Sequence, residues 1–409
     1  MFKKSIVYAS CLLLALQIVP NIRVSQTIEV SADTVQNDYD INTLTEQISN
    51  YMLSTVSNPV HSSIGGEWVV IQLARSENLT PEYTASYLKS LDETLNNTNG
   101  VLSTTKSTEY ARVIIALSCL GIDASNYTTA DGNSYNLTSP LADFNFVKKQ
   151  GINGAIYSLI ALDTNNYTIP TNLNDTIQTT RDGIIEYIIS QKLDTGGWNL
   201  TGSIADVDIT AMTIQALSPY YNTNQEVHSA IDEALTVLSD MQLPDGGYSS
   251  LGNENSESVA QVLCALCSLG INPATDERYI KGQNWLVSNL MENYAISDET
   301  NNTLSFSHLP NGEVNQVATE QVGYSLTAYY RLLNGKSWLY DCTPTKEYTI
   351  GDINQDGKVS TADLILLKKS LLASTTLNDV QKLSADINGD GKVSTADLIL
   401  LKKRLLGIE

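Results

Sequence analysis

The sequence predicts an all-α protein, in which an α6/α6 toroid of paired helices is followed by a small C-terminal module of two loop–helix units. Two observations lead to this fold class. From Ile41 to Gly335, apolar residues recur almost throughout at the i, i+3, i+4 spacing of helices, with loops rich in Gly, Asn, Asp and Thr between them. The chain then carries nearly the same segment twice, as Asp352–Lys369 and Asp386–Lys403, with Gln355 against Gly389 as the one difference.

The N-terminus has the features of a secretory signal. Lys3 and Lys4 precede an apolar run over residues 6–19, and the small residues of 30–32 offer a cleavage site. The run is short for a membrane-spanning helix. We therefore predict a signal peptide over 1–32, an N-terminal extension over 33–40, a secreted extracellular protein and no membrane insertion.

Composition narrows the class of partner. The 409 residues suffice for two or three domains with a large core. The 45 acidic residues and 24 Lys and Arg give a net charge of −21, and loss of 1–32, which carries +2, makes it −21 − 2 = −23. Such acidity argues against nucleic acid and anionic membranes as partners.

Four cysteines follow the signal peptide, which is too few for a disulfide scaffold. Cys264 and Cys267 have redox or zinc spacing, but they stand inside an apolar helical run and are interpreted as small buried hydrophobes. No cofactor is therefore expected in the toroid.

Six helix pairs are predicted between residues 41 and 335, which form the toroid, and residues 336–350 are predicted to be a linker. The second helix of each pair is the more apolar, so we expect six inner helices ringed by six amphipathic outer ones. The predicted pairs are 42–56 with 66–77, 80–97 with 107–121, 141–148 with 152–163, 176–191 with 207–221, 224–242 with 255–270, and 276–293 with 315–334.

Two loops link this region to known toroids. Gln191–Trp198 (QKLDTGGW) and Gln242–Tyr248 (QLPDGGY) resemble the glutamine–tryptophan repeat of terpenoid cyclases and protein prenyltransferases. The resemblance implies that Gln caps a helix end and that the aromatic ring packs over the Gly-Gly turn. The whole region is similar to the secreted bacterial proteins known as prenyltransferase/squalene-oxidase-repeat proteins, which implies a fold and leaves activity open.

The stretch Asp206–Leu217 (DVDITAMTIQAL) resembles the Asp-x-Asp-Asp-Thr-Ala stretch of squalene-type cyclases, with Asp208 in the place of the acid that protonates an alkene. Ile209 replaces the third Asp, the chain has only four Phe and four Trp, and 318–324 lacks the His of a prenyltransferase zinc set. Cyclase or prenyltransferase activity is therefore not expected. A similarity to cobalamin carriers leaves a corrinoid or isoprenoid ligand as a weaker alternative.

A polar residue stands near the start of each predicted inner helix, so these residues should meet at one mouth of the toroid. They are Glu67, Glu109, Asn153, Asp208, Glu257 and Glu320. One interpretation is that acids stabilise helix N-termini through the macrodipole. The other is a ligand pocket, with Asp208 and either Glu257 or Glu320 as an acid–base pair acting on a glycan.

The repeated segments have the ligand spacing of calcium loops, with Gly at position 6 where the loop must turn. The predicted ligands of two calcium ions are Asp352, Asn354, Asp356, Lys358 (carbonyl), Ser360 and Asp363 in the first loop, and Asp386, Asn388, Asp390, Lys392 (carbonyl), Ser394 and Asp397 in the second. Near-identity of two such loops makes a plain helix-capping turn a poor explanation.

Each unit lacks an entering helix and has Asp at position 12. This pattern over 351–409 resembles a type I dockerin, a calcium-folded module. The resemblance implies a cohesin module of a scaffold protein as partner, and two equivalent binding orientations, because the two copies are nearly superimposable. The implied cohesin contacts are Thr361, Ala362, Lys368, Lys369, Thr395, Ala396, Lys402 and Lys403.

Taken together, the sequence suggests a secreted component of a cellulosome-type complex, whose dockerin carries a toroid that binds a ligand or glycan. A carbohydrate-active enzyme, either a glycoside hydrolase or a lyase in polysaccharide degradation, is the alternative. Few Trp residues are available for a sugar-stacking cleft, so both hypotheses stay open.

Overall fold

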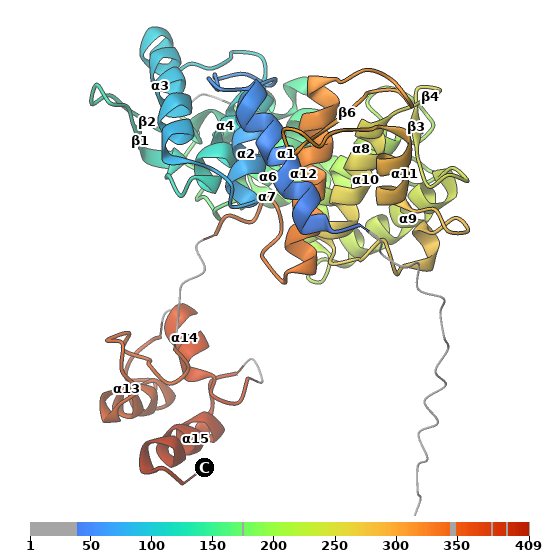
Figure 1. The fold of residues 1–409 in the computed structure, drawn as a ribbon. Coiled ribbons are helices and arrows are strands. Elements are labelled where there is room, and N and C mark those ends of the chain that lie inside the picture. The colour runs from blue at the N-terminus through green and yellow to red at the C-terminus, as the bar shows by residue number, and fades with distance from the viewer. Residues whose placement is uncertain (1–38, 174–175, 344–348, 378, 390–391, 409) are drawn as a thin grey trace, which may run out of the picture. The chain divides into compact units, whose positions relative to one another are not determined.

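The computed structural model describes residues 39–408, except 174–175, 344–348, 378 and 390–391. The predicted signal peptide lies outside the described residues, as does most of the extension at 33–40. No helix in the described part of the chain is long and apolar enough to cross a membrane. Residues 39–343 form the toroid and residues 349–408 form a C-terminal module (Figure 1).

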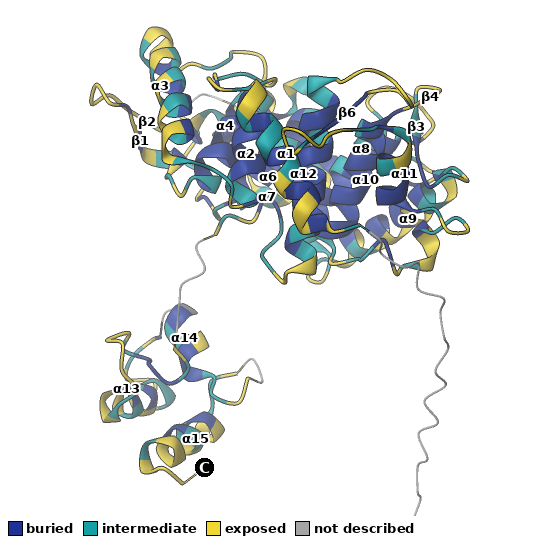
Figure 2. Ribbon diagram, in the orientation of Figure 1, coloured by how far each residue is buried: buried dark blue, intermediate teal, exposed yellow. Residues whose placement is uncertain are grey.

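Six helices form a closed inner ring. Each packs against the next, and the last packs back against the first. They are α2 (Glu67–Arg75), α4 (Ser107–Cys119), α6 (Ile152–Asp163), α8 (Val207–Leu217), α10 (Ser256–Ser268) and α12 (Gln316–Leu333). Burial on nearly all sides explains their apolar sequences, and Figure 2 shows them mostly in the colour of buried residues.

Six outer helices alternate with the inner ones along the chain. They are α1 (Ile41–Thr55), α3 (Pro81–Thr98), α5 (Phe144–Val147), α7 (Arg181–Ser190), α9 (Gln225–Met241) and α11 (Leu286–Asn293). Helix α9 buries a single stripe that runs from Val227 to Leu238, with polar residues on its other face. The predicted all-α class and α6/α6 toroid are confirmed.

Three predicted outer helices are longer than the real ones. The helix predicted over 141–148 is the four-residue α5, between 3-10 turns at Ser139–Ala142 and Lys148–Gln150. Helix α7 begins at Arg181 because Thr180 caps it. Helix α11 begins at Leu286 instead of 276, because Gly282 has a φ of +69° and Trp285 is extended, so the backbone there is not helical.

Asx residues define where the inner helices α8, α10 and α12 begin. Side-chain oxygens of Asp206, Asn255 and Asn315 accept hydrogen bonds from backbone N–H groups three residues later, at 2.8–3.0 Å. Such caps satisfy N–H groups that have no partner within the helix. The caps thereby set the positions of Asp208 and Glu257 in the first turns of α8 and α10, and of Glu320 in the second turn of α12.

The two glutamine–aromatic loops brace outer helices to the inner ring. Trp198 and Tyr248 are buried, and each donates a hydrogen bond at 2.9 Å to a carbonyl of the preceding outer helix. Gln242 donates to the Gly246 carbonyl across the turn. Within the described residues, the Gln191 side chain hydrogen-bonds only to the neighbouring Ser190 hydroxyl, so it does not cap the turn in the way that the resemblance implied.

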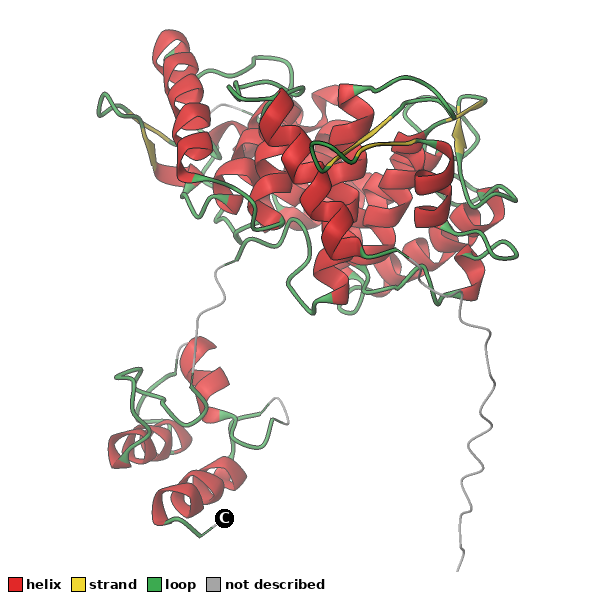
Figure 3. Cartoon of the chain, in the orientation of Figure 1, coloured by secondary structure: helices red, strands yellow, loops and turns green. Residues whose placement is uncertain are grey.

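Three small hairpins, which the sequence did not predict, sit on the ring (Figure 3). They pair β1 (Tyr127–Thr128) with β2 (Ser134–Tyr135), β3 (Ser249–Ser250) with β4 (Asn253–Glu254), and β5 (Ala295–Asp298) with β6 (Thr303–Phe306). Strand β6 packs against α1 and α12, and the chain after it runs to the start of α12.

Residues 336–342, predicted to open the linker, instead pack on the toroid; we call them the strap. Leu339 and Tyr340 are buried, and the Thr164 hydroxyl donates to the Tyr340 carbonyl at 2.6 Å. The Arg75 and Arg331 guanidinium groups bind carbonyls of the strap. The toroid therefore extends beyond residue 335, because these donors hold backbone that has no regular structure of its own.

The C-terminal module contains α13 (Thr361–Leu371), α14 (Asp379–Ala385) and α15 (Thr395–Leu406). Helices α13 and α15 pack together and are the two predicted exiting helices, whereas α14 was not predicted. A small core formed by Ile353, Leu367, Leu377, Ala385 and Leu401 holds them. The module is a pair of loop–helix units, as the duplicated sequence indicated.

Candidate functional site

A cavity of about 370 Å³ opens where the inner helices begin. Its walls come from α2, α6, α8, α10, α12 and the loop before α2. The lining residues are Ser63, Ile64, Trp68, Tyr157, Asp208, Met212, Glu257, Gln261, Val317, Glu320, Gln321 and Tyr324. We call it the mouth cavity, and its volume is in the range of small-molecule sites.

The six predicted mouth residues do not behave alike. Asp208, Glu257 and Glu320 line the mouth cavity, whereas Glu67, Glu109 and Asn153 do not. The structure therefore divides the expected ring of six into a cavity-lining half and a half outside the cavity.

Glu67, which is buried, and Glu109, which is partly exposed, belong to one ion network. Arg112 Nε lies 2.7 Å from Glu67 Oε2, and its Nη2 lies 2.6 Å from Glu109 Oε2. The other oxygen of the fully buried Glu67 accepts from Tyr87 Oη and contacts His61 Nδ1 at 2.7 Å. These two acids are thus engaged in packing, and the prediction that they line a ligand pocket is wrong.

Glu320 is buried and holds the loop before α2 in place. Its Oε1 accepts from Gly65 N–H and Gln316 Nε2, each at 2.8 Å. Burial raises the pKa of this carboxyl, and the two hydrogen bonds lower it in part. Because its Oε1 already accepts hydrogen bonds from two fixed groups, Glu320 is better suited to positioning the loop before α2 than to proton transfer.

Asp208 has a different environment. Burial raises its pKa to about 6, and the charges of Asp206 and Glu257 add to the rise. Asp208 Oδ1 and Ser258 Oγ are both buried without a hydrogen-bond partner among the described residues. Asp208 is therefore a carboxyl that holds a proton more tightly than usual, at the wall of a cavity.

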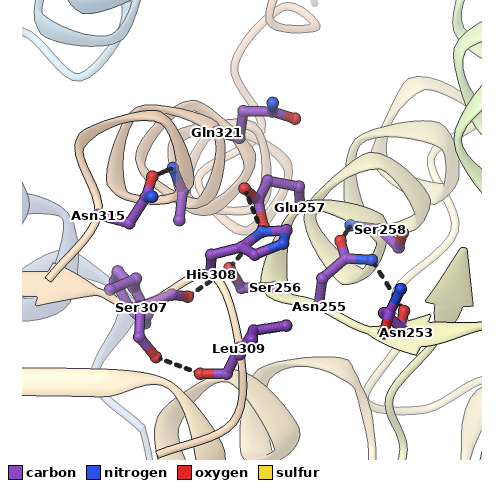
Figure 4. A network of polar contacts seen from close by, with 12 residues as sticks. Asn253, Asn255, Ser256, Glu257, Ser258, Ser307, His308, Leu309, Asn315 and Gln321 are labelled. Carbon is purple, nitrogen blue, oxygen red and sulfur yellow. Dashed lines mark hydrogen bonds and ion pairs between the residues drawn. The ribbon is translucent and has the colours of Figure 1, made fainter. Parts of the chain in front are cut away.

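Glu257 faces a histidine that the sequence did not connect with it. His308 Nδ1 lies 2.9 Å from both carboxylate oxygens of Glu257, and Figure 4 shows the two side chains pointing toward one another. Ser256 fixes the histidine's loop, because its Oγ donates to the Ser307 carbonyl at 2.7 Å. The pair is 51 residues apart in the chain, so no local motif could reveal it.

Aromatic rings and amides complete the cavity. The Trp68 ring lies with its centroid 5.8 Å from Tyr157, 5.5 Å from Tyr324 and 6.4 Å from Tyr340. Gln261 Nε2 donates to Tyr324 Oη at 2.5 Å and to Gln321 Oε1 at 2.9 Å. Tyr340, which packs on Trp68 without lining the cavity, comes from the strap, so sequence reasoning that assigned this segment to a linker missed it.

This arrangement suits proton transfer. A carboxyl with a pKa of about 6 can donate a proton near neutral pH, and a carboxylate bonded to imidazole can accept one. Aromatic rings and side-chain amides are suited to contact an uncharged ring with hydroxyl groups.

Within the described residues, no group of three or more His, Cys, Asp or Glu side chains is placed to hold a metal ion. The predicted calcium loops use Asn, Ser and carbonyl oxygens as well. In the first loop, Asp352 and Asp363 are buried and accept hydrogen bonds from backbone N–H groups of the loop. Neither carboxylate forms an ion pair with a basic side chain within the part of the chain described. Buried negative charge requires a counter-charge, and a loop rich in oxygen ligands suits a hard cation such as Ca²⁺.

The second loop repeats this arrangement as far as the structure describes it. Asp397 is fully buried and accepts from Ile387 N–H at 2.9 Å and Ser394 N–H at 2.8 Å. Predicted ligand Asp390 lies outside the described residues. The carboxylate at position 12 of each loop, Asp363 or Asp397, thus holds the loop together by accepting hydrogen bonds from the loop's backbone N–H groups.

The residues implied to contact a cohesin are all exposed. They are Thr361, Ala362, Lys368 and Lys369 on α13, and Thr395, Ala396, Lys402 and Lys403 on α15. Ile365 and Ile399, which are equivalent in the two copies, are also more than half exposed. The two units therefore present matching surfaces.

Comparison with known families concerns the C-terminal module first. Residues 350–406 match the family described as Dockerin type I domain. The class that fold and sequence define is therefore an α/α toroid followed by a dockerin type I domain. The predicted dockerin is confirmed. No curated protein matches this chain.

Solved structures with some likeness include an unsaturated glucuronyl hydrolase from Bacillus sp. GL1, at 11% identity and a TM-score of 0.48, over 75% of this chain and 99% of that one. A possible member of the GH105 family from Salmonella enterica serovar Paratyphi A has 10% identity and a TM-score of 0.38, over 79% and 100%. These low values define no activity for this chain. The α/α toroid itself rests on the closed ring of inner helices and the outer helices around it.

Proposed function

We propose that this protein is a secreted enzyme that cleaves a glycosidic bond, by hydrolysis or elimination, and that its dockerin domain attaches it to a cohesin-bearing scaffold. One observation carries the proposal for the toroid. The Asp208 carboxyl has a pKa raised to about 6, and its buried Oδ1 has no partner within the described chain, in a cavity shared with Glu257.

In this proposal Asp208 donates a proton to the oxygen that leaves as the glycosidic bond breaks. Glu257, oriented by His308, accepts the proton of the attacking water, or the proton of a sugar carbon if the reaction is an elimination. Trp68 supplies a ring face for the sugar, and Gln321 supplies an amide for its hydroxyl groups. Glu320 holds the rim of the cavity through Gly65.

The test is made with the purified full-length protein on a panel of plant and host glycans. We expect product release that Asp208→Asn and Glu257→Gln each reduce at least 100-fold, while Asp232→Asn on the outer surface of α9 leaves it unchanged. If glycans bind but the parent protein releases no product, the toroid is a binding module and the enzymatic proposal fails.

For the dockerin domain, we propose that two Ca²⁺ ions complete its fold. In the first loop Asp352, Asn354, Asp356, Ser360, Asp363 and the Lys358 carbonyl would hold the ion, and the second loop would use its equivalents. The buried carboxylates of Asp352, Asp363 and Asp397 support this, because buried charge requires a counter-charge.

We propose a cohesin module as the partner of the exposed faces of α13 and α15. Their equivalence supports two binding orientations related by the internal repeat. An extracellular location follows from the predicted signal peptide together with the dockerin domain. Calorimetric titration with cohesin modules, in Ca²⁺ and in EDTA, tests both the partner and the ion.

A further inference from the structure

Two cysteines from distant parts of the chain meet at the end of the ring opposite the mouth cavity. Cys119 is the last residue of α4, and Cys342 ends the strap, 223 residues later. Their Sγ atoms are 2.8 Å apart, whereas a disulfide bond measures about 2.0 Å. Both residues are partly exposed, so they lie near the surface of the toroid.

Independent contacts hold the strap where Cys342 meets Cys119. The Cys342 N–H donates to the Thr164 carbonyl at 2.8 Å, and the Thr164 hydroxyl donates to the Tyr340 carbonyl. Arg75 Nη2 binds the Trp338 and Asp341 carbonyls, each at 2.9 Å. The two sulfur atoms are therefore brought together by surrounding structure, and bond formation needs only a small movement.

The surroundings also make one of the two thiols reactive. The hydrogen bond from the Cys119 thiol lowers the pKa of Cys342 to about 7, and Arg75 adds to this against the effect of burial. Burial raises the pKa of Cys119. Cys342 is thus the thiol that forms the attacking thiolate.

We propose that Cys119 and Cys342 form a disulfide bond in the secreted protein, a step that rests on the proposed extracellular location. The oxidant is a low-molecular-weight disulfide. The Cys342 thiolate attacks one of its sulfur atoms, forming a mixed disulfide and releasing one thiol. Cys119, having lost its proton, then attacks Cys342 Sγ and releases the second thiol, so two cysteine thiols are oxidised and one external disulfide is reduced.

The bond would join the strap to the ring. Tyr340 of the strap packs against Trp68, which lines the mouth cavity, so the bond would hold in place a residue that supports Trp68. From Cys342 the chain continues to the dockerin domain, so a mechanical force on that domain is transmitted to the toroid at this residue. The disulfide bond would prevent such a force from displacing Tyr340.

Cys264 and Cys267 provide an internal control. Both are buried on α10, and burial raises the pKa of each thiol, so they should stay reduced. We expect the full-length protein, secreted and then denatured, to have these two thiols alkylated without reductant and all four mature-chain cysteines alkylated after reduction. Peptide mapping should find Cys119 linked to Cys342.

A stability measurement separates a bond from simple packing. Reductant should lower the melting midpoint of the parent by about 5 °C. Cys119→Ser and Cys342→Ser should melt at that lower midpoint, and reductant should not affect them, while Cys264→Ser should keep the parent's response. If all four cysteines of the parent alkylate without reductant after incubation with oxidised glutathione, the proposal is overturned. This result does not depend on glycan cleavage, so it tests the bond separately from the proposed enzyme.

Discussion

At the scale of single residues, the polar groups at the mouth have different chemical roles. Arg112 forms ion pairs with both Glu67 and Glu109, and Gln316 with Gly65 engages one oxygen of Glu320. Asp208 has a pKa raised to about 6 and an oxygen that has no hydrogen-bond partner within the described residues. The proposed chemistry therefore belongs to Asp208 and Glu257.

Asp208→Asn should lose activity and gain stability at neutral pH. The native pKa of about 6 exceeds the ordinary 3.8, so the carboxyl stabilises the fold below pH 3.8 and loses that contribution as the pH rises through 6. An amide carries no charge to desolvate, so unfolding at pH 7 should cost up to about 2 kcal/mol more in the variant. Urea denaturation of both proteins at pH 4 and pH 7 measures this. Equal stability differences at both pH values would contradict the raised pKa.

Activity should also fall as the pH rises above about 6, because Asp208 then loses the proton it donates. The measurement is kcat/KM against pH for the released sugar. A profile that stays flat between pH 5 and pH 8 would show that Asp208 is not the proton donor.

His308→Gln should lower kcat about 10-fold or more while it leaves the melting midpoint unchanged, because His308 is about half exposed and acts through Glu257. His228→Gln is the matched control, since His228 pairs with Asp232 on the outer helix α9. Steady-state kinetics and thermal melts of both variants are needed. Equal kinetic losses in the two variants would argue against a role at the mouth.

At the scale of elements, short caps place the site residues. Asn255 fixes the first turn of α10, in which Glu257 lies, by accepting from Ser258 N–H at 2.8 Å. Asn224 caps the outer helix α9 in the same way, far from any mouth residue. The two caps therefore allow a comparison between α10, which carries the site residue Glu257, and α9, which carries no site residue.

Asn255→Ala and Asn224→Ala should each cost about 1 kcal/mol of stability, because each leaves helix N–H groups without a partner. Only Asn255→Ala should also reduce catalysis, by shifting Glu257 relative to His308. Denaturation and kinetics, measured side by side, give the answer. Similar activity in both variants would mean that the cap does not position the carboxylate.

At the scale of the whole molecule, the toroid and the dockerin domain are stabilised differently. The toroid buries a large apolar core, whereas the dockerin core consists of a few residues around Leu367 and Leu401. A core this small needs ligand binding to supply folding free energy.

EDTA should therefore unfold the dockerin domain and leave the toroid folded. Circular dichroism of the full chain should show a low-temperature transition in EDTA that Ca²⁺ removes, with the toroid transition unchanged. Asp363→Ala with Asp397→Ala should reproduce the EDTA result in the presence of Ca²⁺. A melting curve insensitive to Ca²⁺ would refute the calcium loops.

Much of the fold could be predicted because local patterns encode it. Helical periodicity defined the inner helices to within a few residues, and the near-exact repeat identified the dockerin domain. Outer helices were predicted too long where a glycine or an extended residue such as Trp285 interrupts an otherwise helical pattern. The hairpins carry too few residues to give a periodic signal.

The candidate site could be predicted only in part. Residue type and helix register selected Asp208, Glu257 and Glu320, but also Glu67 and Glu109, because an acid at a helix start has the same pattern whether it faces a cavity or an arginine. His308 joins the site, and Tyr340 packs on Trp68, through contacts between segments far apart in the chain.

By itself, then, the sequence determined the helix classes, the toroid and the duplicated module, since each depends on spacings within a few tens of residues. The tertiary structure decided which acids are paired with an arginine, which remain at the cavity, and that the strap brings Cys342 to Cys119. These outcomes depend on ring closure, which sets partners more than 200 residues apart side by side and fixes burial and charge around each group.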